Sequence, residues 1–241
     1  MRRDRRPDRN AYFPFPPERS AQAKRGFRWR RPRHTLKGRQ DAGEINRVGL
    51  RLQIRRQQAQ AGDIVLLYED ESEALTHPYL AHAWAPRGAD LRVAAPGQSK
   101  KVAMLGVLDA ITRELIVHTS PTKRSTDFIA LLERLDAHFG PKPGRTTRPV
   151  VLVLDNGPIH TSKASMAALS ARSWITVKWL PRYAPELNDI ELSWRDLKRH
   201  HLAHRTFHDT AVLDAAIHEA VKDLNRERGR QHPCDKSRIA A

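Results

Sequence analysis

The sequence contains a single cysteine, Cys234, in 241 residues, and this scarcity excludes several classes of protein. No disulfide can form within the chain, so a small secreted fold held by disulfides is excluded and a reducing compartment fits. A zinc site would have to be built mainly from histidine and carboxylate side chains, and no suitable spacing occurs. No run approaches about 18 consecutive apolar residues, which argues against a membrane span. The arginine-rich N-terminus has no apolar run after it and is unlike a secretory signal.

Acidic residues are scarce in the first quarter of the chain. Residues 1–60 hold 18 Lys and Arg against 5 Asp and Glu, a net charge of +13, whereas the other 181 residues carry only +3 of the total of +16. A basic segment of this kind favours polyanions, because binding releases the counterions of a nucleic acid. The charge therefore indicates a nucleic-acid partner. The alternative is a solvated leader with no partner, and charge alone does not indicate an enzyme.

The composition divides the chain into three parts. Residues 1–24 mix arginine, proline and isolated aromatics without periodicity, which is typical of disorder. A basic segment around Trp29 follows, and residues 41–61 have the scattered apolar positions of a helix or helical linker. We predict a basic leader and linker over 1–60, a compact domain over 61–228 and a disordered tail over 229–241.

Short apolar runs predict the strands of the compact domain. Residues 64–70 are an apolar run that ends in acids, residues 102–110 and 114–120 read as an antiparallel hairpin, and two further strands cover 150–155 and 175–180. An irregular insertion over 76–100 precedes the hairpin.

Apolar stripes at helical spacing predict the helices. One helix covers 125–139 with Ser125 as its N-cap, a second covers about 161–172, a third begins near Leu187 or Ile190, and the last covers about 209–226. The order of elements predicts an α/β fold, in which three antiparallel strands and then parallel strands form a mixed sheet with helices on both faces. The apolar stripe of the first helix consists of Phe128, Leu132, Leu135 and Phe139, and that of the last helix consists of Leu213, Ile217, Ala220 and Leu224.

Three acids have positions that favour a metal site. Asp70 and Asp155 end two apolar runs, and Glu191 lies in the first turn of a predicted helix. Side chains at strand ends converge on a crevice, and close carboxylates repel unless one is protonated or a cation joins them. Mg²⁺ and Mn²⁺ prefer such oxygen ligands, and paired ions promote phosphodiester displacement. Each acid taken alone reads better as a solvated end of a strand or helix, and it is their joint placement that favours a site.

The segments LLYEDES, VLDNGPIHTSK and LPRYAPELNDIELSWRDLKRH resemble the DDE transposases of mariner-like bacterial insertion sequences. The spacing of 35 residues between Asp155 and Glu191 is close to that of the family. The resemblance implies a ribonuclease-H-like catalytic domain in which Asp70, Asp155 and Glu191 hold Mg²⁺ or Mn²⁺, as two ions, for DNA cleavage and strand transfer. The third segment matches the family at Pro181, Tyr183, Pro185, Leu187, Asn188, Ile190, Glu191, Trp194 and Lys198.

The sequence departs from the family pattern in two places. Asp189 stands where the family has proline, and this extra carboxylate either favours the dipole of the helix that follows or disturbs the metal site. The family also begins with helix-turn-helix units that recognise terminal inverted repeats, and only residues 26–39 resemble the end of that region. We therefore interpret the chain as the second product of a split reading frame or as a truncated remnant.

Further residues are candidates for supporting roles. Arg195 and Lys198 follow Glu191 on one helix face, where they would reach DNA phosphates or form a solvated basic face. His160 either contacts the site or is an ordinary loop histidine. Asn156 and Asn188 would orient the acids or satisfy turn backbone. In the leader, Arg30, Arg31 and Arg33 are candidate DNA contacts.

Core packing is the better interpretation of Trp194 and Leu197, which continue the apolar stripe that begins at Ile190. The cluster formed by Arg199, His200, His201 and His204 reads as solvated surface rather than as a metal site.

Three functions remain in competition. The first is a transposase whose partners are the element's terminal inverted repeats and target DNA, in the bacterial cytoplasm at the nucleoid, with a homodimer left open. The second is a catalytically inactive remnant that binds DNA non-specifically. The third is a ribonuclease-H-like nuclease acting on another substrate. The intact set of acids favours the first, and the missing recognition units favour the second.

Overall fold

The structure is a computed structural model that describes residues 37–95, 97–144 and 147–231. The chain divides into two compact units, Met1–Gly38 and Arg39–Ala241, and the description below concerns the second. The predictions made for residues 1–36, which include Arg30, Arg31 and Arg33, lie outside the described residues, as does Cys234.

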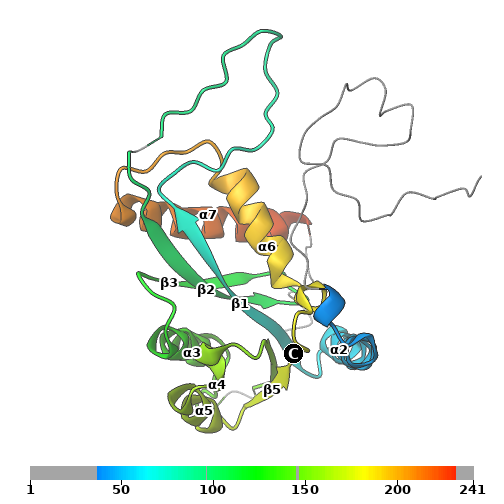
Figure 1. Cartoon of the computed structure of the whole chain (residues 1–241). Helices are drawn as coiled ribbons and strands as arrows, with labels where there is room; N and C mark the ends of the chain where they lie inside the picture. The colour runs from blue at the N-terminus through cyan, green and yellow to red at the C-terminus, as the bar shows by residue number, and fades with distance from the viewer. Residues whose placement is uncertain (1–36, 96, 145–146, 232–241) are drawn as a thin grey trace, which may run out of the picture. The chain divides into compact units, whose positions relative to one another are not determined.

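A five-stranded mixed sheet forms the centre of the domain (Figure 1), with the strand order β3-β2-β1-β4-β5. β1 pairs with β2, and β2 with β3, in antiparallel fashion, whereas β4 is parallel to both β1 and β5. This arrangement confirms the predicted α/β class and the predicted division into antiparallel and parallel strands. The strands are β1 (Val65–Leu75), β2 (Lys101–Asp109), β3 (Leu115–Ser120), β4 (Val150–Leu154) and β5 (Ile175–Trp179).

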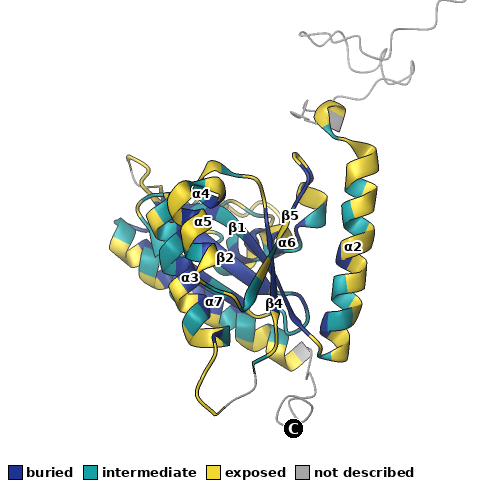
Figure 2. Ribbon diagram, turned by 90° about the horizontal axis from the view of Figure 1, so that it is seen from below, coloured by how far each residue is buried: buried dark blue, intermediate teal, exposed yellow. Residues whose placement is uncertain are grey.

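Helices cover both faces of the sheet. Figure 1 shows α3, α4 and α5 on one side and α6 and α7 on the other, and each side has its own apolar core, buried between sheet and helices in Figure 2. The helices are α2 (Ala42–Ala61), α3 (Ser125–Phe139), α4 (Pro158–Thr161), α5 (Lys163–Ser170), α6 (Ile190–Asp196) and α7 (Thr210–Gln231); the short turns are η1 (Lys37–Arg39), η2 (Pro185–Leu187) and η3 (Leu197–His201), of which η3 is a π-helical continuation of α6.

The two apolar stripes predicted from the sequence face these cores. In α3, Phe128, Leu132 and Leu135 are fully buried, and in α7 the side chains of Leu213 and Ile217 are fully buried as well. Since the spacing of these residues places them on one helix face, burial of that face is what holds each helix against the sheet.

The N-cap predicted for α3 is wrong by one residue. The cap is Arg124, and Ser125 is already the first residue of the helix. The carboxylate of Asp127 accepts a hydrogen bond of 2.8 Å from the backbone N–H of Arg124, and it also accepts from the hydroxyls of Ser120 and Thr122. An acid in the first turn therefore supplies the stabilising contact expected from a capping serine.

The helix predicted over about 161–172 is α5, which is shorter at both ends, and a separate short helix, α4, lies before it. Pro158 opens α4, where its fixed backbone and missing N–H are tolerated. Ser162 then adopts an extended conformation, with ψ of 153°, and its hydroxyl accepts a hydrogen bond of 3.1 Å from the N–H of Ser165. Ser162 thus ends α4 and caps α5.

Two elements are longer than predicted. β1 continues through the acids to Leu75, because β2 pairs with it from Leu67 to Leu75. α7 runs to Gln231, so residues 229–231 belong to this helix, and the remainder of the predicted tail lies outside the described residues. No helix among the residues that the structure describes is long and apolar enough to cross a membrane.

Candidate active site

The register of the central strands brings two of the predicted acids to one level. β4 pairs with β1 only as far as Val153, which lies opposite Tyr68. Continuing that parallel register by two residues places Asp155 level with Asp70. Asp70 therefore lies in a part of β1 that β4 no longer flanks, which leaves room beside it at the edge of the sheet. The sequence predicted a strand that ends at the acids; the acids instead lie within a longer strand whose neighbour ends.

Asp70 is partly buried among other carboxylates. Burial, and after it the negative charges of Glu191, Glu71 and Asp155, together raise the pKa of Asp70 to about 7, against a hydrogen bond from the backbone of Glu71. The carboxylates of Glu191 and Asp155 are thus close enough to repel that of Asp70. The three predicted acids come together from β1, from the residue after β4 and from the first turn of α6.

Asp155 is fixed through one of its two oxygens. Oδ1 accepts a hydrogen bond of 2.7 Å from the N–H of Gly157 and lies 2.8 Å from Nδ1 of His160. The hydrogen bond with His160 lowers the pKa of Asp155, against the opposing effect of burial. A Cβ at position 157 would lie 2.8 Å from Oδ1, so any larger residue there would displace the Asp155 carboxylate. Only Oδ1 is hydrogen-bonded among the described residues, and the side chain is 53% exposed.

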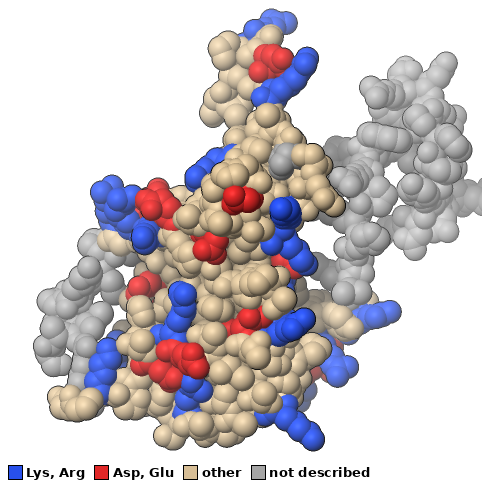
Figure 3. Space-filling view, turned by 90° about the vertical axis from the view of Figure 1, so that its left-hand side faces the viewer, with Lys and Arg blue, Asp and Glu red and all other residues tan. Residues whose placement is uncertain are grey.

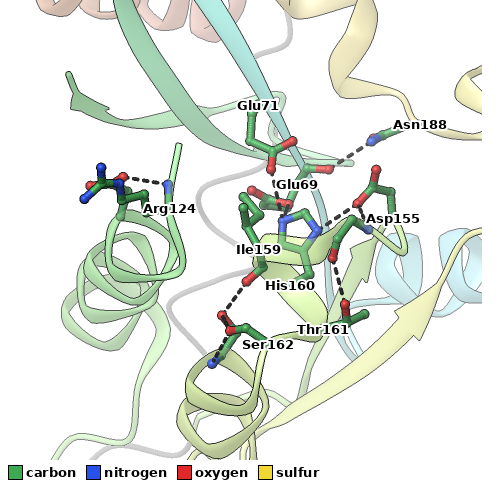
Figure 4. A network of polar contacts seen from close by, with 12 residues as sticks. Glu69, Glu71, Arg124, Asp155, Ile159, His160, Thr161, Ser162 and Asn188 are labelled. Atoms are coloured by element: carbon green, nitrogen blue, oxygen red, sulfur yellow. Dashed lines mark hydrogen bonds and ion pairs between the residues drawn. The ribbon is translucent and has the colours of Figure 1, made fainter. Parts of the chain in front are cut away.

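His160 lies directly behind this carboxylate, fully buried, with its ring edge against Phe128 at a centroid distance of 4.7 Å. Figure 4 shows the imidazole between Asp155 on one side and Glu69 and Glu71 on the other. Burial lowers the pKa of His160, but its contacts with Asp155 and Glu69 outweigh this effect and raise the pKa to about 10. The ring is therefore a buried imidazolium, and His160 contacts the site rather than being an ordinary loop histidine.

Glu69 is the residue that the sequence analysis missed. Its side chain is fully buried, and its Oε2 lies 2.9 Å from Nε2 of His160. The approach is that of an ion pair rather than of a well-directed hydrogen bond, and neither Glu69 oxygen has a hydrogen-bond donor among the described residues. Burial raises the pKa of Glu69 while His160 lowers it. Alternation along β1 was the available signal, because Glu69 follows Leu67 on a face that packs against α3.

Glu191 is positioned by the packing of α6. Ile190 and Trp194 are buried on the side of the sheet opposite α3, and a Cβ at Gly106, which pairs with Asp70, would lie 2.4 Å from the Trp194 ring. This close approach holds the start of α6 over Asp70. The burial of Trp194 and Leu197 confirms that they are core residues.

The two asparagines support the backbone around the acids. Nδ2 of Asn188 donates to the carbonyl of Glu69 at 2.9 Å, and Nδ2 of Asn156 donates to the carbonyl of Leu180 at 2.6 Å. The first bond ties the segment before α6 to β1, and the second joins the ends of β4 and β5. Of the two roles considered for these residues, both bonds fit the satisfaction of backbone groups.

Asp189 points away from the three acids. Its Oδ2 lies 2.6 Å from Nη2 of Arg56 in α2 and 3.4 Å from Nη1 of Arg113 in the β2–β3 turn. The extra carboxylate is therefore neutralised by two arginines. It links α2 to the segment that carries Glu191 and does not disturb the acid cluster.

Lys198 and Arg195 differ in their surroundings. Nζ of Lys198 donates to the hydroxyl of Ser72 at 2.6 Å and lies 5.7 Å from the centre of the Tyr79 ring. Burial and the charge of Lys123 lower the pKa of Lys198, while Glu191 and Asp70 raise it, so the ammonium group lies near the acids. Arg195 is exposed and its nearest acid is its neighbour Asp196, at 3.9 Å. The structure brings Lys198 to the acids, whereas Arg195 has no contact with them.

The three carboxylates fit a hard divalent cation by their chemistry. Crowded acids that raise one another's pKa are relieved when a cation enters, and Asp155 keeps one oxygen available for it. Over residues 37–95, 97–144 and 147–231, no group of three or more His, Cys, Asp or Glu side chains is placed so that it could by itself hold a metal ion. Water or substrate oxygens would therefore have to complete the coordination of an ion at these acids.

Comparison with known proteins agrees with this arrangement. An uncharacterised 39 kDa protein of the insertion element IS630 from Shigella sonnei is 32% identical over 132 residues, which are 55% of this chain and 37% of that protein. The chain thus matches little more than a third of its relative's length. The fold is similar to Mos1 transposase in a paired-end complex with its left transposon end, with a TM-score of 0.56 and 16% identity over 87% of this chain and 68% of that one.

A second Mos1 structure, a mariner paired-end complex with Mn, has a TM-score of 0.53 and 17% identity over 88% of this chain and 69% of that one. At these identities the likeness concerns the fold. The family model described as DDE superfamily endonuclease matches residues 65–214, which span all five strands and carry Asp70, Asp155 and Glu191. The chain belongs to the DDE superfamily endonuclease family.

Proposed function

We propose that this chain is the catalytic part of a transposase that cleaves DNA at the ends of an insertion element and joins the freed end to target DNA. The proposal rests chiefly on one observation, the convergence of Asp70, Asp155 and Glu191 at the sheet edge where β4 ends and β1 continues. The relative encoded by an insertion element and the fold shared with Mos1 transposase support it.

In this proposal the three carboxylates hold two Mg²⁺ or Mn²⁺ ions. When bound, such ions activate the attacking oxygen and stabilise the leaving oxygen of a phosphodiester. The structure of Mos1 with Mn supports the choice of metal for this chain. The protein's own part is to hold the acids in place: Asp155 through Gly157 and His160, and Glu191 through the packing of Trp194 against Gly106.

Lys198 would bind a phosphate of the DNA strand beside the acids. Its ammonium group is held by Ser72, two residues after Asp70 in β1, and a lysine there attracts a phosphate without ligating a metal ion. Arg30, Arg31 and Arg33 would add non-specific affinity. On the face of the body in Figure 3, basic side chains are interspersed with acidic ones, so the strongest basic excess is in the leader.

The metal site is tested by calorimetry with Mn²⁺ and by cleavage of duplex DNA taken from the region that flanks the chain's own reading frame. Asp70→Asn, Asp155→Asn and Glu191→Gln should each abolish Mn²⁺-dependent cleavage and weaken Mn²⁺ binding at least tenfold, about the effect of removing a charged ligand. Glu73→Gln is the matched control, because Glu73 lies in the same strand but pairs with Lys101 and Lys123.

The outcome separates the proposed enzyme from an inactive remnant. Wild-type protein that binds Mn²⁺ and DNA but leaves every such duplex intact, even with the upstream reading frame expressed alongside, would be a remnant. A Glu73→Gln variant that loses as much Mn²⁺ affinity as Asp70→Asn would show that the three acids have no special role.

The contribution of the leader is tested through salt dependence. Replacing Arg30, Arg31 and Arg33 together by glutamine should reduce the slope of log affinity against log salt by up to about 2.7, since each phosphate contact contributes about 0.9. Replacement of the exposed Lys222, Arg226 and Arg230 of α7 is the control of equal charge change. Equal slopes in both triple variants would contradict a specific role for the leader.

A further inference from the structure

The buried pair of His160 and Glu69 has no part in binding metal directly, because both side chains are enclosed behind Asp155. We propose that they are positioning residues, which fix the orientation of the Asp155 carboxylate so that Oδ1 is held and Oδ2 is left for the metal. This inference rests on the proposed function, since it assigns to Asp155 the role of a metal ligand.

The contacts around Asp155 define its orientation. Gly157 N–H and His160 Nδ1 both meet Oδ1, at 2.7 and 2.8 Å, and two partners on one oxygen fix the plane of the carboxylate. His160 belongs to α4 and Gly157 is the residue before that helix, so both partners come from the same turn. A carboxylate held in this way has little rotational freedom to lose when a cation binds.

The imidazole is itself held from the opposite side. Nε2 lies 2.9 Å from Oε2 of Glu69 and 3.6 Å from Oε1 of Glu71, and the ring edge packs on Phe128. The backbone carbonyl of Glu69 accepts from Asn188, three residues before Glu191. A continuous set of contacts therefore runs from the segment that carries Glu191, through β1 and His160, to Asp155, and couples the positions of two of the three acids.

A histidine buried only to fill the core would give different results from a positioning histidine when it is replaced by its two amide analogues. In the same rotamer, the amide nitrogen of His160→Asn takes the place of Nδ1 and can donate to Asp155, but Asn does not reach Glu69. The amide nitrogen of His160→Gln takes the place of Nε2 and can donate to Glu69, but it leaves Asp155 without this partner.

The two variants should therefore rank in opposite orders in two measurements on the full chain. In urea denaturation His160→Gln should be the more stable, because its amide nitrogen still lies beside the Glu69 carboxylate in the core. In calorimetry with Mn²⁺ alone, His160→Asn should bind within about threefold of wild type, whereas His160→Gln should bind about 10- to 100-fold more weakly, the usual effect of losing a residue that orients a ligand. If Mn²⁺ affinity follows stability, so that Gln binds as tightly as Asn or both match wild type, the positioning role is overturned.

A variant elsewhere in the same core controls for general loosening. Leu169→Ala removes a buried side chain of α5 without touching Asp155, His160 or Glu69, so it should lower stability and leave Mn²⁺ affinity unchanged. An equal loss of Mn²⁺ affinity in Leu169→Ala would overturn the proposal.

A measurement on the unsubstituted chain does not depend on whether the variants fold. Titration with diamagnetic Mg²⁺ should shift the ring nitrogen signals of His160 in NMR spectra, because its partner Asp155 is then a metal ligand. Bound Mg²⁺ with unshifted His160 signals would overturn this inference alone, as would intact Mn²⁺ binding in His160→Gln beside its loss in Asp155→Asn. A wild-type chain that binds neither ion would overturn the proposed function and this inference together.

Discussion

Two consecutive residues of β1, Glu69 and Asp70, lie on opposite faces of the sheet and have opposite environments. Glu69 is fully buried on the α3 side with an imidazolium beside it, whereas Asp70 lies on the α6 side among acids. Burial raises the pKa of both acids, but His160 opposes this effect at Glu69, whereas the neighbouring carboxylates add to it at Asp70. Two acids adjacent in sequence can therefore have different roles: Asp70 lies among carboxylates whose repulsion an incoming cation would relieve, and Glu69 supports His160.

The largest expected effect comes from removing Glu69. Glu69→Ala leaves the charge of His160 buried with Glu71 at 3.6 Å and Asp155 as its remaining acids, and breaking a buried ion pair costs about 3–5 kcal/mol. Urea denaturation should show a loss of stability of this size. Glu73→Ala, in the same strand but partly exposed, should change stability by no more than about 1 kcal/mol. Equal losses in the two variants would contradict the contrast between a buried and a peripheral acid.

Asp70 should behave in the opposite way. Its pKa is raised from 3.8 to about 7, so in the metal-free protein the folded state keeps a proton that the unfolded chain has released between these values. The stability associated with Asp70 is therefore fully present below about pH 4 and is lost as the pH rises to 7.

Asp70→Asn removes this loss. In EDTA the variant should be more stable than wild type by about 2 kcal/mol at pH 8, roughly half of what the full shift would allow, and should match it near pH 4. Urea denaturation at the two pH values measures both. A variant that is less stable than wild type at pH 8 would show that the ionised form of Asp70 is not destabilised where it lies.

Lys198 should separate DNA binding from metal binding on the Asp70 side of the sheet. Lys198→Ala should weaken binding of an element-end duplex by about 1 kcal/mol or more, the size of a lost charged hydrogen bond, and leave Mn²⁺ affinity unchanged. Lys222→Ala is the matched control for the loss of one positive charge, because Lys222 is an exposed residue of α7 that is far in sequence from the three acids. Normal DNA binding by Lys198→Ala would show that its face of α6 does not meet DNA.

Much of the fold could be predicted from the sequence because local patterns determine it. The strands and the stripes of α3 and α7 are visible as apolar periodicity, and burial of Phe128 and Leu213 confirms them. The sequence also indicates that Asp70 and Asp155 are candidates, since both follow apolar runs. The two acids lie close together only because β1 pairs with β4, whose paired residues are 85 positions apart in the chain. A local sequence pattern carries no information about such a pairing.

The missed features depend on contacts between distant residues. Glu69 could have been suspected from its place on the same face as Leu67, but its partner His160 lies in another element and its burial follows from how α4 packs. The short helix α4, which the sequence analysis did not predict, is only four residues long and carries no apolar stripe that would reveal it. The role of Asp189 depends on two arginines, one from α2 and one from a turn.

Asp189 provides the smallest expected effect, because the backbone at this position, where the family has proline, has a conformation that proline can adopt. Residue 189 has φ of −61° and ψ of −21°, and Asn188 before it is extended at φ of −104° and ψ of 100°, conformations that proline and the residue before it favour. No backbone carbonyl of the described residues accepts a hydrogen bond from the N–H of Asp189 outside the helices and strands.

Asp189→Pro and Asp189→Ala should therefore differ. Both lose the ion pairs with Arg56 and Arg113, which are partly exposed and contribute about 0.5–1 kcal/mol together. Proline also restricts the unfolded chain, which stabilises a compatible site by about 0.4–1 kcal/mol. The alanine variant should lose about 0.5–1 kcal/mol in urea denaturation, and the proline variant should stay within about 0.5 kcal/mol of wild type. In an Arg56→Gln background the loss caused by alanine should shrink, because one partner is already gone. A proline variant less stable than the alanine variant would mean that the acid has reshaped the turn before Glu191 and does more than tie α2 to it.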